Sequence, residues 1–296
     1  MQDERIVSLC WDFELLPEFP DHWEPSLVVE DLAFIDYWQT GSSAIAPRLP
    51  GLRNLEFWGL SNLDKLDLSG VPNLIHLRCS YNQVTDLDLY HTLHLTHLEC
   101  GCNKVRELDL TCVPNLTHLD CRNNDLADLE LMSVPKLTYL DCSSNSFANL
   151  DLSGCETLRH LNCSQSKLTN LDLSGVQNLT HLDCGQSEIL ELDLSSVPNL
   201  TYLKCSQTQL SSLDLSKTPD LVYLYCDGTQ LRDLDLSNTI ALKNVTCWNN
   251  SISKLDLTAV HSKLVNVYCD DDLIVDANGN EIVVRLSETI EEDYIP

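Results

Sequence analysis

The chain has 296 residues, and its 45 Asp and Glu against 18 Lys and Arg give a net charge of −27. This charge argues against nucleic acid and anionic membranes as partners, and it leaves a basic protein or a cation possible. No stretch reaches the roughly 18 apolar residues of a membrane-spanning helix. The first residues lack the basic start and apolar run of a signal peptide, so we expect a cytoplasmic protein or one exported without a Sec signal.

Residues 1–50 do not fit the repeat that follows them, and they contain Trp11, Trp23 and Trp38. A repeat array would expose apolar side chains and an unpaired strand edge at its first coil. We therefore interpret residues 1–50 as an N-terminal cap. Within it, the segment from Pro25 to Trp38 predicts a helix, with a strand as the alternative.

Residues 51–272 are built from a repeat of 21 residues, as Leu116-Thr-His-Leu-Asp-Cys121 and Leu179-Thr-His-Leu-Asp-Cys184 illustrate. Cysteines recur at this spacing at 79, 100, 121, 142, 163, 184, 205, 226 and 247, and then at 269. The phrase Leu-Asp-Leu recurs at the same spacing. Such self-similarity predicts a solenoid, here of about ten to eleven coils.

The unit can be numbered from the leucine at 74, 95, 116 and so on, which makes positions 1, 4, 6, 11, 14 and 16 apolar. Positions 4 and 6 lie two residues apart and so share the core-facing side of a strand. Position 9 is Asn at 82, 103, 124, 145 and 250 and Ser or Thr at 166, 187, 208 and 229. An Asn side chain at this position can form hydrogen bonds with backbone groups where the strand turns a corner. Ser and Thr can form only part of these hydrogen bonds. The five residues that return to the next strand are too few for a helix, so we expect a second short strand and a turn.

These residues resemble the leucine-rich repeat, whose consensus is Leu-x-x-Leu-x-Leu-x-x-Asn-x-Leu. The 21-residue unit with Cys at position 6 is most similar to the bacterial cysteine-ladder variety found in the internalin family. The resemblance implies a right-handed superhelix with a parallel sheet on its concave face, where that family commonly binds other proteins. The expected fold class is a mainly β repeat solenoid with a cap at each end.

Ten of the fourteen cysteines occupy one repeat position, which is a packing pattern. Neighbouring coils lie about 4.8 Å apart, beyond the roughly 3.8 Å between the Cβ atoms of a disulfide. We therefore expect reduced, buried thiols. Cys10, Cys102, Cys112 and Cys155 lie off this ladder and are the candidates for exposure.

Residues 273–296 end the chain with two expected strands around Asn278-Gly279, followed by an acidic tail. An Asn-Gly pair between such strands predicts a β-hairpin, which would cap the last coil. The segment from Asp276 to Asn280 has some features of a calcium loop. Its glycine comes too early for an EF-hand, and no helices flank it, so the hairpin is favoured.

Positions 3, 5 and 7 should point outward from the sheet. In the first half they form a grid of imidazoles and carboxylates that includes His118, Tyr139, Asp141, His160, His181 and Asp183. Such a grid could be a metal site, acid–base machinery or a polar binding surface. A flat sheet spreads its ligands in parallel, whereas zinc needs converging ligands and catalysis usually needs a pocket. We therefore predict no catalytic residues, no metal and no cofactor.

Aromatic residues gather at these positions on the last strands: Tyr202, Tyr223, Tyr225, Trp248 and Tyr268, edged by Asp227 and Asp270. Clustered aromatic side chains are typical of interface hot spots. The alternative is that the rings stack on one another and only stabilise the sheet. We predict that these seven residues and the six of the grid named above form a partner-binding surface.

Position 15 places Asp or Glu in every coil from Asp67 to Asp256. Like charges 5 Å apart repel by only about 0.8 kcal/mol in water, so a solvated acidic face is the simplest interpretation. Weak calcium binding or a basic partner is the alternative, and salt dependence would separate the two.

The sequence therefore predicts a non-enzymatic module that binds a protein with a basic surface through the concave face of its repeats. In a bacterial setting this could be an immunity or inhibitor protein, or an effector exported without a Sec signal. One alternative is a hydrolase or metal-dependent enzyme that uses the His/Asp grid. Another is an acidic mimic of nucleic acid.

Overall fold

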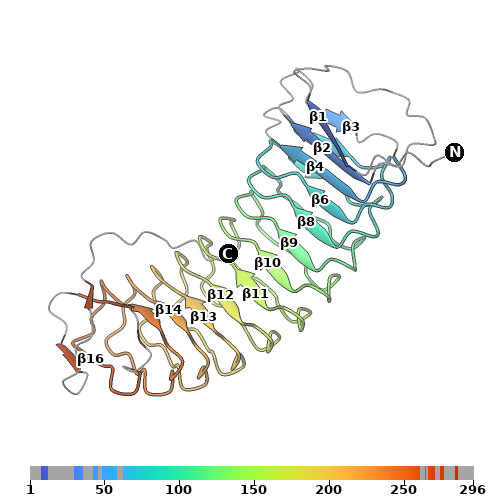
Figure 1. The fold of residues 1–296 in the computed structure, drawn as a ribbon. Helices are drawn as coiled ribbons and strands as arrows, with labels where there is room; N and C mark the ends of the chain where they lie inside the picture. The colour runs from blue at the N-terminus through green and yellow to red at the C-terminus, as the bar shows by residue number, and fades with distance from the viewer. Residues whose placement is uncertain are drawn as a thin grey trace. The chain divides into compact units, whose positions relative to one another are not determined.

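The computed structural model describes residues 8–12, 30–35, 43–45, 49–58, 63–260, 264, 266–270, 274–276 and 284–285. All regular secondary structure in these residues is β-strand, and none of it is a helix that could span a membrane (Figure 1). The chain divides into two compact units, Met1–Leu158 and Arg159–Pro296. Each unit is a stack of coils joined by parallel strands, so the predicted solenoid is confirmed.

The first unit contains a parallel sheet with one strand from each coil. In spatial order its strands are β1 (Ser8–Asp12), β2 (Asp31–Ile35), β4 (Asn54–Trp58), β6 (His76–Arg78), β8 (His97–Glu99), β9 (His118–Asp120) and β10 (Tyr139–Asp141). A smaller parallel sheet joins β3 (Ser43–Ile45), β5 (Lys65–Asp67) and β7 (Asp86–Leu87).

The second unit repeats this arrangement. Its larger sheet has the order β11 (His160–Asn162), β12 (His181–Asp183), β13 (Tyr202–Lys204), β14 (Tyr223–Tyr225), β15 (Asn244–Thr246), β17 (Asn266–Tyr268) and β19 (Val284–Arg285). Its smaller sheet pairs β16 (Lys254–Asp256) with β18 (Ile274–Asp276). From β11 to β15, equivalent residues of successive coils are Cα partners.

The amino-terminal segment extends the sheet, although its sequence does not fit the repeat. Ser8 pairs with Asp31, and Asp31 pairs with Asn54, each 23 residues further along the chain. This register aligns Leu9, Leu32 and Leu55 with one another, and Trp11, Phe34 and Phe57 with one another. The helix predicted between Pro25 and Trp38 is wrong over β2, where the strand alternative is right. The open edge of β4 offers backbone groups that a strand satisfies and a helix does not.

The carboxyl-terminal hairpin is also corrected. β18 and β19 are the two expected strands, but β18 pairs in parallel with β16 and β19 pairs in parallel with β17. The preceding coil offers two open strand edges, and pairing with them prevails over the local turn preference of Asn-Gly. Asn278 and Gly279 lie outside the described residues.

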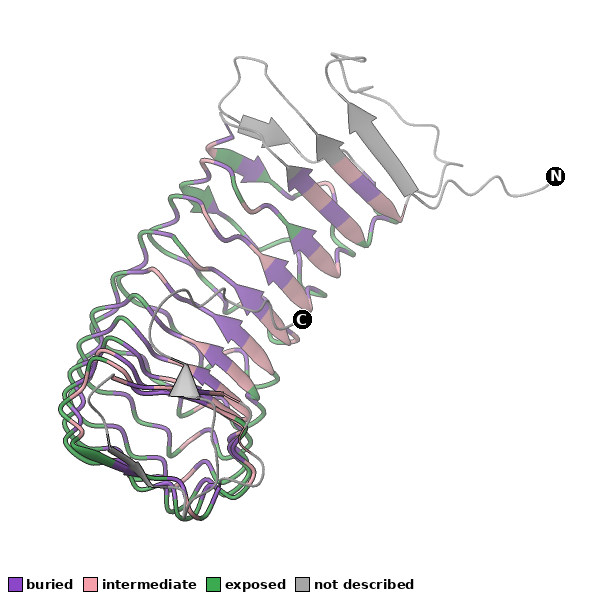
Figure 2. Ribbon diagram, turned by 60° about the vertical axis from the view of Figure 1, so that its left-hand side comes forward, coloured by how far each residue is buried: buried purple, intermediate pink, exposed green. Residues whose placement is uncertain are grey.

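Apolar side chains fill each coil from the predicted positions. In the coil that starts at Leu116, the side chains of Leu116, Leu119, Cys121 and Leu126 are all fully buried. Figure 2 shows this buried row running along the middle of the strands, flanked by more exposed residues. The burial pattern confirms the predicted register, in which positions 4 and 6 face the core.

The described cysteines are free thiols, and all of those on the ladder are buried. The side chain of Cys10 lies outside the described part of the structure. Burial raises the pKa of the Cys79 thiol to about 12. Cys102 and Cys112 are partly exposed, as expected, but Cys155 is fully buried. The expectation of exposure was wrong for Cys155 because it occupies position 19, a core position that Val113 and Val134 fill in the two preceding coils.

Among the described residues of the repeats, 51–272, the second strand expected on the outer side of each coil forms only in β5, β7 and β16. In the coils between β7 and β16 the Leu-Asp-Leu phrase is buried at its leucines but is not a strand.

Position 9 closes a corner of the coil with its side chain. Asn124 Nδ2 donates to the carbonyls of Cys100, Cys121 and Arg122, and its Oδ1 accepts the Val105 N–H at 3.0 Å. Ser166, Ser187, Thr208 and Thr229 each donate to the carbonyl of position 6 in their own coil. Ser and Thr thus supply part of what Asn supplies, as predicted.

Position 8 has a left-handed backbone conformation in every described coil from β6 to β15. The values of φ lie between 51° and 62° for Tyr81, Cys102, Asn123, Ser144, Gln165, Gln186, Gln207, Gly228 and Asn249. Left-handed residues other than glycine carry a steric cost. The coil needs this conformation to turn out of the strand directly before the corner at position 9.

Candidate functional site

The strands of both units present positions 3 and 5 on the side away from the core. Position 4 is buried between them, as in Tyr139–Asp141 and Tyr223–Tyr225. Position 7 continues this surface just after each strand. We call the surface formed by positions 3, 5 and 7 the sheet face.

In the first unit, the rings at position 3 form a continuous row along the sheet. The centroids of His97 and His118 lie 5.5 Å apart, and those of His118 and Tyr139 lie 4.1 Å apart in a stacked geometry. His76 meets His97 edge to face at 4.4 Å. Burial lowers the pKa of His76, His97 and His118, because a partly desolvated imidazole is harder to charge. The row is therefore neutral at pH 7.

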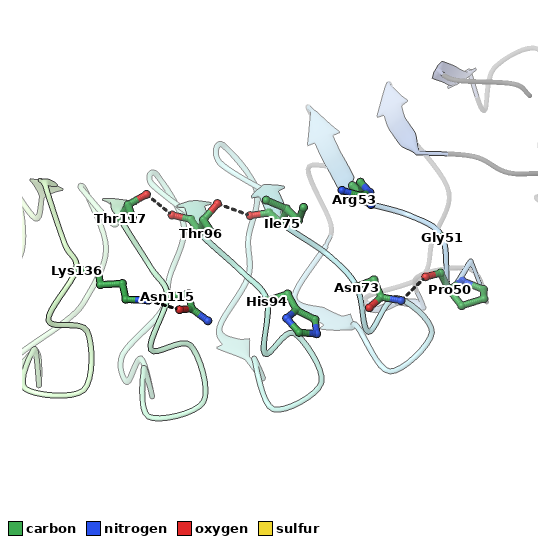
Figure 3. Close-up of a pocket in the computed structure, with 10 residues that line it drawn as sticks. All are labelled: Pro50, Gly51, Arg53, Asn73, Ile75, His94, Thr96, Asn115, Thr117 and Lys136. Atoms are coloured by element: carbon green, nitrogen blue, oxygen red, sulfur yellow. Dashed lines mark hydrogen bonds between the residues drawn. The ribbon is translucent and has the colours of Figure 1, made fainter.

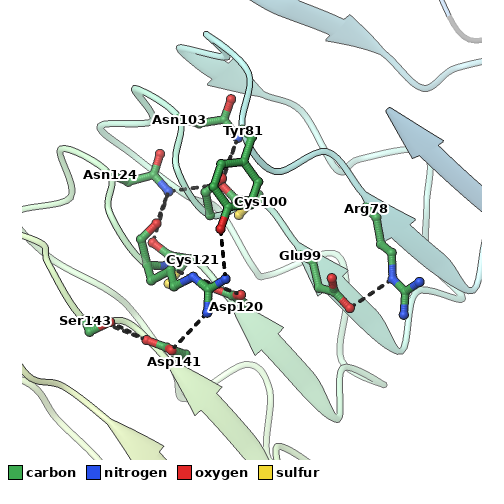
Figure 4. Close-up of polar contacts among 12 residues, drawn as sticks. Arg78, Tyr81, Glu99, Cys100, Asn103, Asp120, Cys121, Asn124, Asp141 and Ser143 are labelled. Carbon is green, nitrogen blue, oxygen red and sulfur yellow. Dashed lines mark hydrogen bonds and ion pairs between the residues drawn. The ribbon is translucent and has the colours of Figure 1, made fainter. Parts of the chain in front are cut away.

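Positions 5 and 7 of the same unit hold an arginine and two carboxylates, of which Figure 4 labels the carboxylates Asp120 and Asp141. Arg122 Nε lies 3.6 Å from Asp120 Oδ2, and Nη1 lies 3.8 Å from Asp141 Oδ2. Arg122 Nη2 donates to the Tyr81 hydroxyl at 3.4 Å. Burial raises the pKa of Asp120 to about 6, although the charge of Arg122 opposes this shift.

Sequence reasoning missed Arg122 and Tyr81. They occupy positions 7 and 8 of coils that are not adjacent, and the residues at these positions differ from coil to coil. An arginine two residues after a carboxylate was the available signal. The contact with Tyr81 depends on side-chain reach across the intervening coil.

In the second unit, tyrosines gather on β13 and β14. Tyr202 lies 6.3 Å from Tyr223 and 5.5 Å from Tyr225, measured between ring centroids. All three are half-buried, so each ring packs on the sheet and keeps part of its surface in solvent. Lys204 Nζ is 3.6 Å from Asp183 Oδ2.

The stacking alternative also has support in this unit. His160 and His181 stack at 5.5 Å, and His181 and Tyr202 stack at 5.8 Å. Stacking along position 3 therefore accounts for the rings of that row. Tyr225 at position 5 and Trp248 at position 7 lie outside the row.

The remaining members of the predicted aromatic surface lie on the following coils. Tyr268 is separated from Tyr225 by Thr246 in the strand register. Trp248 is half-buried, and its Nε1 is shielded from solvent without a hydrogen bond among the described residues. Asp270 accepts the backbone N–H of Asn249 at 2.7 Å.

Several of the predicted carboxylates fix the backbone. Asp141 is 4% exposed and accepts both the N–H and the hydroxyl of Ser143. Asp227 is 8% exposed and accepts the hydroxyls of Ser206 and Thr246 from the two adjacent coils. Asp183 accepts the Gly185 N–H at 3.0 Å. These side chains shape the sheet face and add negative charge to it.

The carboxylates at position 15 act in the same way. In nine coils Asp Oδ1 accepts the backbone N–H two residues later, from Asp67–Ser69 to Asp256–Thr258. The backbone hydrogen bond from Ser174 lowers the pKa of Asp172, and the side-chain bond adds to this. The acidic row therefore has a structural role that the sequence analysis did not recognise, that of holding the turn after Leu-Asp-Leu.

Metal-binding and catalytic geometry is not apparent in the described part of the chain. No three His, Cys, Asp or Glu side chains gather there in a way that could hold a metal ion. A hollow of about 320 Å³ lies on the sheet face at β2, β4 and β6. His76 and Arg78 line it, but none of its lining residues is Ser, Thr, Cys or Lys. The hollow thus lacks a hydroxyl, thiol or amine nucleophile, and its titratable groups are Asp31, Glu56, His76 and Arg78.

Comparisons with known proteins agree with this architecture. The profile "Leucine Rich repeats (2 copies)" matches residues 114–154. The functional domain of InlJ from Listeria monocytogenes, which includes a cysteine ladder, is 31% identical with a TM-score of 0.67. The match covers 71% of this chain and 50% of the InlJ chain, so this chain spans half the length of that relative. No curated protein sequence gave a match.

Other solved structures share the fold at lower identity. The internalin InlF from Listeria monocytogenes is 18% identical with a TM-score of 0.72, covering 84% of this chain and 76% of InlF. A chain of the Drosophila Toll–Spätzle complex is 14% identical with a TM-score of 0.65, covering 88% of this chain and 44% of that chain. At these identities the likeness concerns the fold alone.

The chain thus has the leucine-rich-repeat fold. Its buried cysteines at position 6 make it one of the cysteine-ladder type, and it resembles internalin J.

Proposed function

We propose that this chain is a non-enzymatic module that binds another protein through its sheet face. The observation that carries the proposal is the cluster of Tyr202, Tyr223 and Tyr225, half-buried side chains from neighbouring strands that keep exposed surface. Rigid aromatic side chains that are already packed lose little conformational freedom when a partner covers them. The leucine-rich repeat is typically a scaffold for such interactions.

Electrostatics favours a partner with a basic surface. The chain carries a net charge of −27, and Asp183, Asp227 and Asp270 border the tyrosines. Such a field accelerates encounter with a cationic protein and suppresses encounter with an anionic one. Occupying a basic surface is also how an inhibitor or immunity protein blocks its target, and we assign this chain to that kind of role. Export as an effector would use the same surface.

Replacing Tyr225 and Trp248 together by Ala tests the proposal. Neither side chain lies in the Leu and Cys layer, so the fold should persist, whereas loss of central aromatic anchors should weaken binding more than about tenfold. Partners captured by the wild type from a native lysate are identified by mass spectrometry and then titrated against both proteins. Asp172→Ala combined with Asp193→Ala, outside the sheet face of the same unit, is the control.

A double variant that folds and binds the captured partner normally would place the site elsewhere. One that unfolds would show that Tyr225 and Trp248 belong to the core. The enzyme alternative would gain support only from a turnover that depends on the histidines of the sheet face, and the hollow beside His76 has no Ser, Thr, Cys or Lys in its lining.

A further inference from the structure

A second surface feature lies away from the sheet face, along the edge of the first unit where the strands begin. It is a groove of about 750 Å³ that crosses successive coils (Figure 3). Its walls are residues just before and just after the first leucine of each coil, among them Arg53, Asn73, His94, Thr96, Asn115 and Lys136. The volume falls in the range of roughly 300–1,000 Å³ that is typical of ligand sites.

The charge of the groove is opposite to that of the chain. None of its lining residues is Asp or Glu, although these outnumber Lys and Arg by 45 to 18 in the whole sequence. Arg53, His94 and Lys136 are all exposed. Lys136 Nζ donates to Asn115 Oδ1 at 2.7 Å, a neutral acceptor that leaves the positive charge uncompensated.

Three arginines of the same unit that lie outside the groove form ion pairs. Arg78 pairs with Glu99 at 3.0 Å, Arg106 pairs with Asp125 at 3.9 Å, and Arg122 pairs with Asp120. Within the described residues neither Arg53 nor Lys136 forms an ion pair. The groove therefore gathers cationic side chains in a lining that contains no carboxylate.

The floor of the groove is held by its own hydrogen bonds. Thr96 Oγ1 donates to the Ile75 carbonyl at 3.3 Å, and Thr117 Oγ1 donates to the Thr96 carbonyl at 3.1 Å. Asn73 Nδ2 donates to the Pro50 carbonyl at 2.8 Å. A floor fixed in this way needs little rearrangement when a ligand arrives.

The repeat itself does not require this charge. Asn178, Asn199 and Asp220 occupy the same position in the second unit as His94 and Lys136 in the first. The second unit thus folds the same way with an acid where the first has cations. Within the first unit, the row that contains Arg53 begins with Glu30, which lies outside the groove lining.

We propose that this groove binds an extended acidic peptide segment of a partner protein. Arg53 follows Leu52, whereas His94 and Lys136 precede Leu95 and Leu137. The three side chains thus adjoin every second leucine of the stack, which spaces them by about 10 Å along its axis, although Arg53 lies in a different row from the other two. Three residues of extended chain span about the same length. A segment with acidic side chains at every third residue therefore matches the three cationic side chains. This site is separate from the sheet face and does not depend on the function proposed for it.

The test uses a fluorescent peptide, Glu-Gly-Gly-Glu-Gly-Gly-Glu, titrated with the full chain and followed by anisotropy. Physiological ionic strength limits the repulsion from distant carboxylates, because the Debye length is then about 8 Å. We expect the wild type to bind this peptide and not its lysine counterpart. Arg53→Gln combined with Lys136→Gln should weaken binding at least about tenfold.

Lys104→Gln combined with Arg106→Gln is the matched control, because it removes the same charge from the same unit outside the groove. All four side chains are exposed, and urea unfolding should show that both double variants fold. An equal loss in both variants would overturn the proposal, since it would then report only net charge. Absence of peptide binding by the wild type would also overturn it. So would displacement of the peptide by an equal concentration of inorganic phosphate, which would make the groove a small-anion site.

Discussion

The two units use the same coil but close its corner with different chemistry. In the first unit Asn103, Asn124 and Asn145 each tie carbonyls of two coils together and accept an N–H from the preceding coil. In most coils of the second unit Ser or Thr closes the corner, and Ser187 makes one hydrogen bond, within its own coil. Asn250 is the exception, because it again joins two coils through the carbonyls of Cys226 and Cys247. The fold is the same in both, so the apolar positions define the coil and the corner decides how firmly neighbouring coils are joined.

The sheet faces of the two units differ as well. The first presents imidazoles beside the Arg122 network, and the second presents tyrosines with Lys204 and Asp183. Positions 3, 5 and 7 can vary in this way because the core does not constrain them. One scaffold therefore displays two chemically different surfaces.

The largest expected difference between the units is in thiol labelling, which should be all or none. In the native protein an alkylating reagent should label Cys102 and Cys112, both in the first unit, and no described cysteine of the second. Burial shields the other thiols and raises their pKa, as it does for Cys155 to about 11 and for Cys247 to about 12. Peptide mass spectrometry after a short pulse measures this, and rapid labelling of Cys247 would contradict it.

The next largest effect concerns the corner. Asn124→Ala removes donors to three buried carbonyls and an acceptor for one N–H, which should cost about 2–4 kcal/mol, whereas Ser187→Ala removes one bond and should cost about 1 kcal/mol. Urea unfolding compares the two. Asn124→Ser should fall between them. Equal losses at the two sites would remove the proposed difference between the units.

The raised pKa of Asp120 predicts a pH effect in the first unit. Folded protein holds a proton up to about pH 6 that the unfolded chain releases near its ordinary value of 3.8. The stabilising contribution is therefore present below about pH 3.8 and is lost as the pH rises through 6. Asp120→Asn should remove this dependence, a change of about 1–3 kcal/mol after allowing for partial exposure.

Asn162 shows that an amide fits at this position. Its Oδ1 accepts the Ser164 N–H at 3.1 Å, just as Asp120 Oδ1 accepts the Arg122 N–H at 3.1 Å. The Asp120→Asn variant should therefore keep the turn. Stability curves of wild type and variant between pH 4 and 7 that run parallel would refute the assignment.

Partner binding should depend on pH through the histidines, and this effect should be smaller. Burial lowers the pKa of His97, His118 and His181, so they are neutral at pH 7 and gain charge only as the pH falls. Added positive charge repels a basic partner, so affinity should fall several-fold between about pH 7 and 5. Titration with the captured partner measures this. An affinity that stays constant would exclude the histidine row from the site.

The smallest effect should come from a feature that both units share. Asp109→Ala and Asp172→Ala each remove an acceptor for a backbone N–H two residues later, and the two losses should be small and equal. The corresponding Asn variants should keep the bond and the stability. Thermal unfolding measures all four. A larger loss from the Asn variants than from the Ala variants would show that charge at position 15 matters more than the turn.

The coil could be predicted from sequence because its signal recurs. Leucines at positions 1 and 4 and cysteine at position 6 recur in coil after coil. They indicate both where the strand lies and which of its sides faces the core. The strands β1 and β2 were not recognised as coils of the repeat, because their spacing is 23 residues and aromatic residues take the place of the cysteine. Trp11, Phe34 and Phe57 nevertheless align in the sheet. Irregular spacing hides a repeat even when each copy pairs in register.

The candidate surfaces were less predictable because they depend on contacts between coils. The outward direction of Tyr202 and Tyr225 followed from the two-residue period of a strand. The contact of Arg122 with Tyr81 depends on how far both side chains reach across a coil. At the carboxyl end, the pairing of β18 and β19 depended on the strand edges that the preceding coil leaves open.

The left-handed residue at position 8 limits which substitutions a coil can tolerate. This column reads Tyr, Cys, Asn, Ser, Gln, Gln, Gln, Gly and Asn, and none of these is proline or β-branched at Cβ. Proline cannot adopt a positive φ, and valine, isoleucine and threonine do so only at high cost. Backbone geometry alone therefore restricts which substitutions this surface position tolerates. A new coil could be designed with either a polar or an apolar residue at position 8, provided that these four residues are excluded.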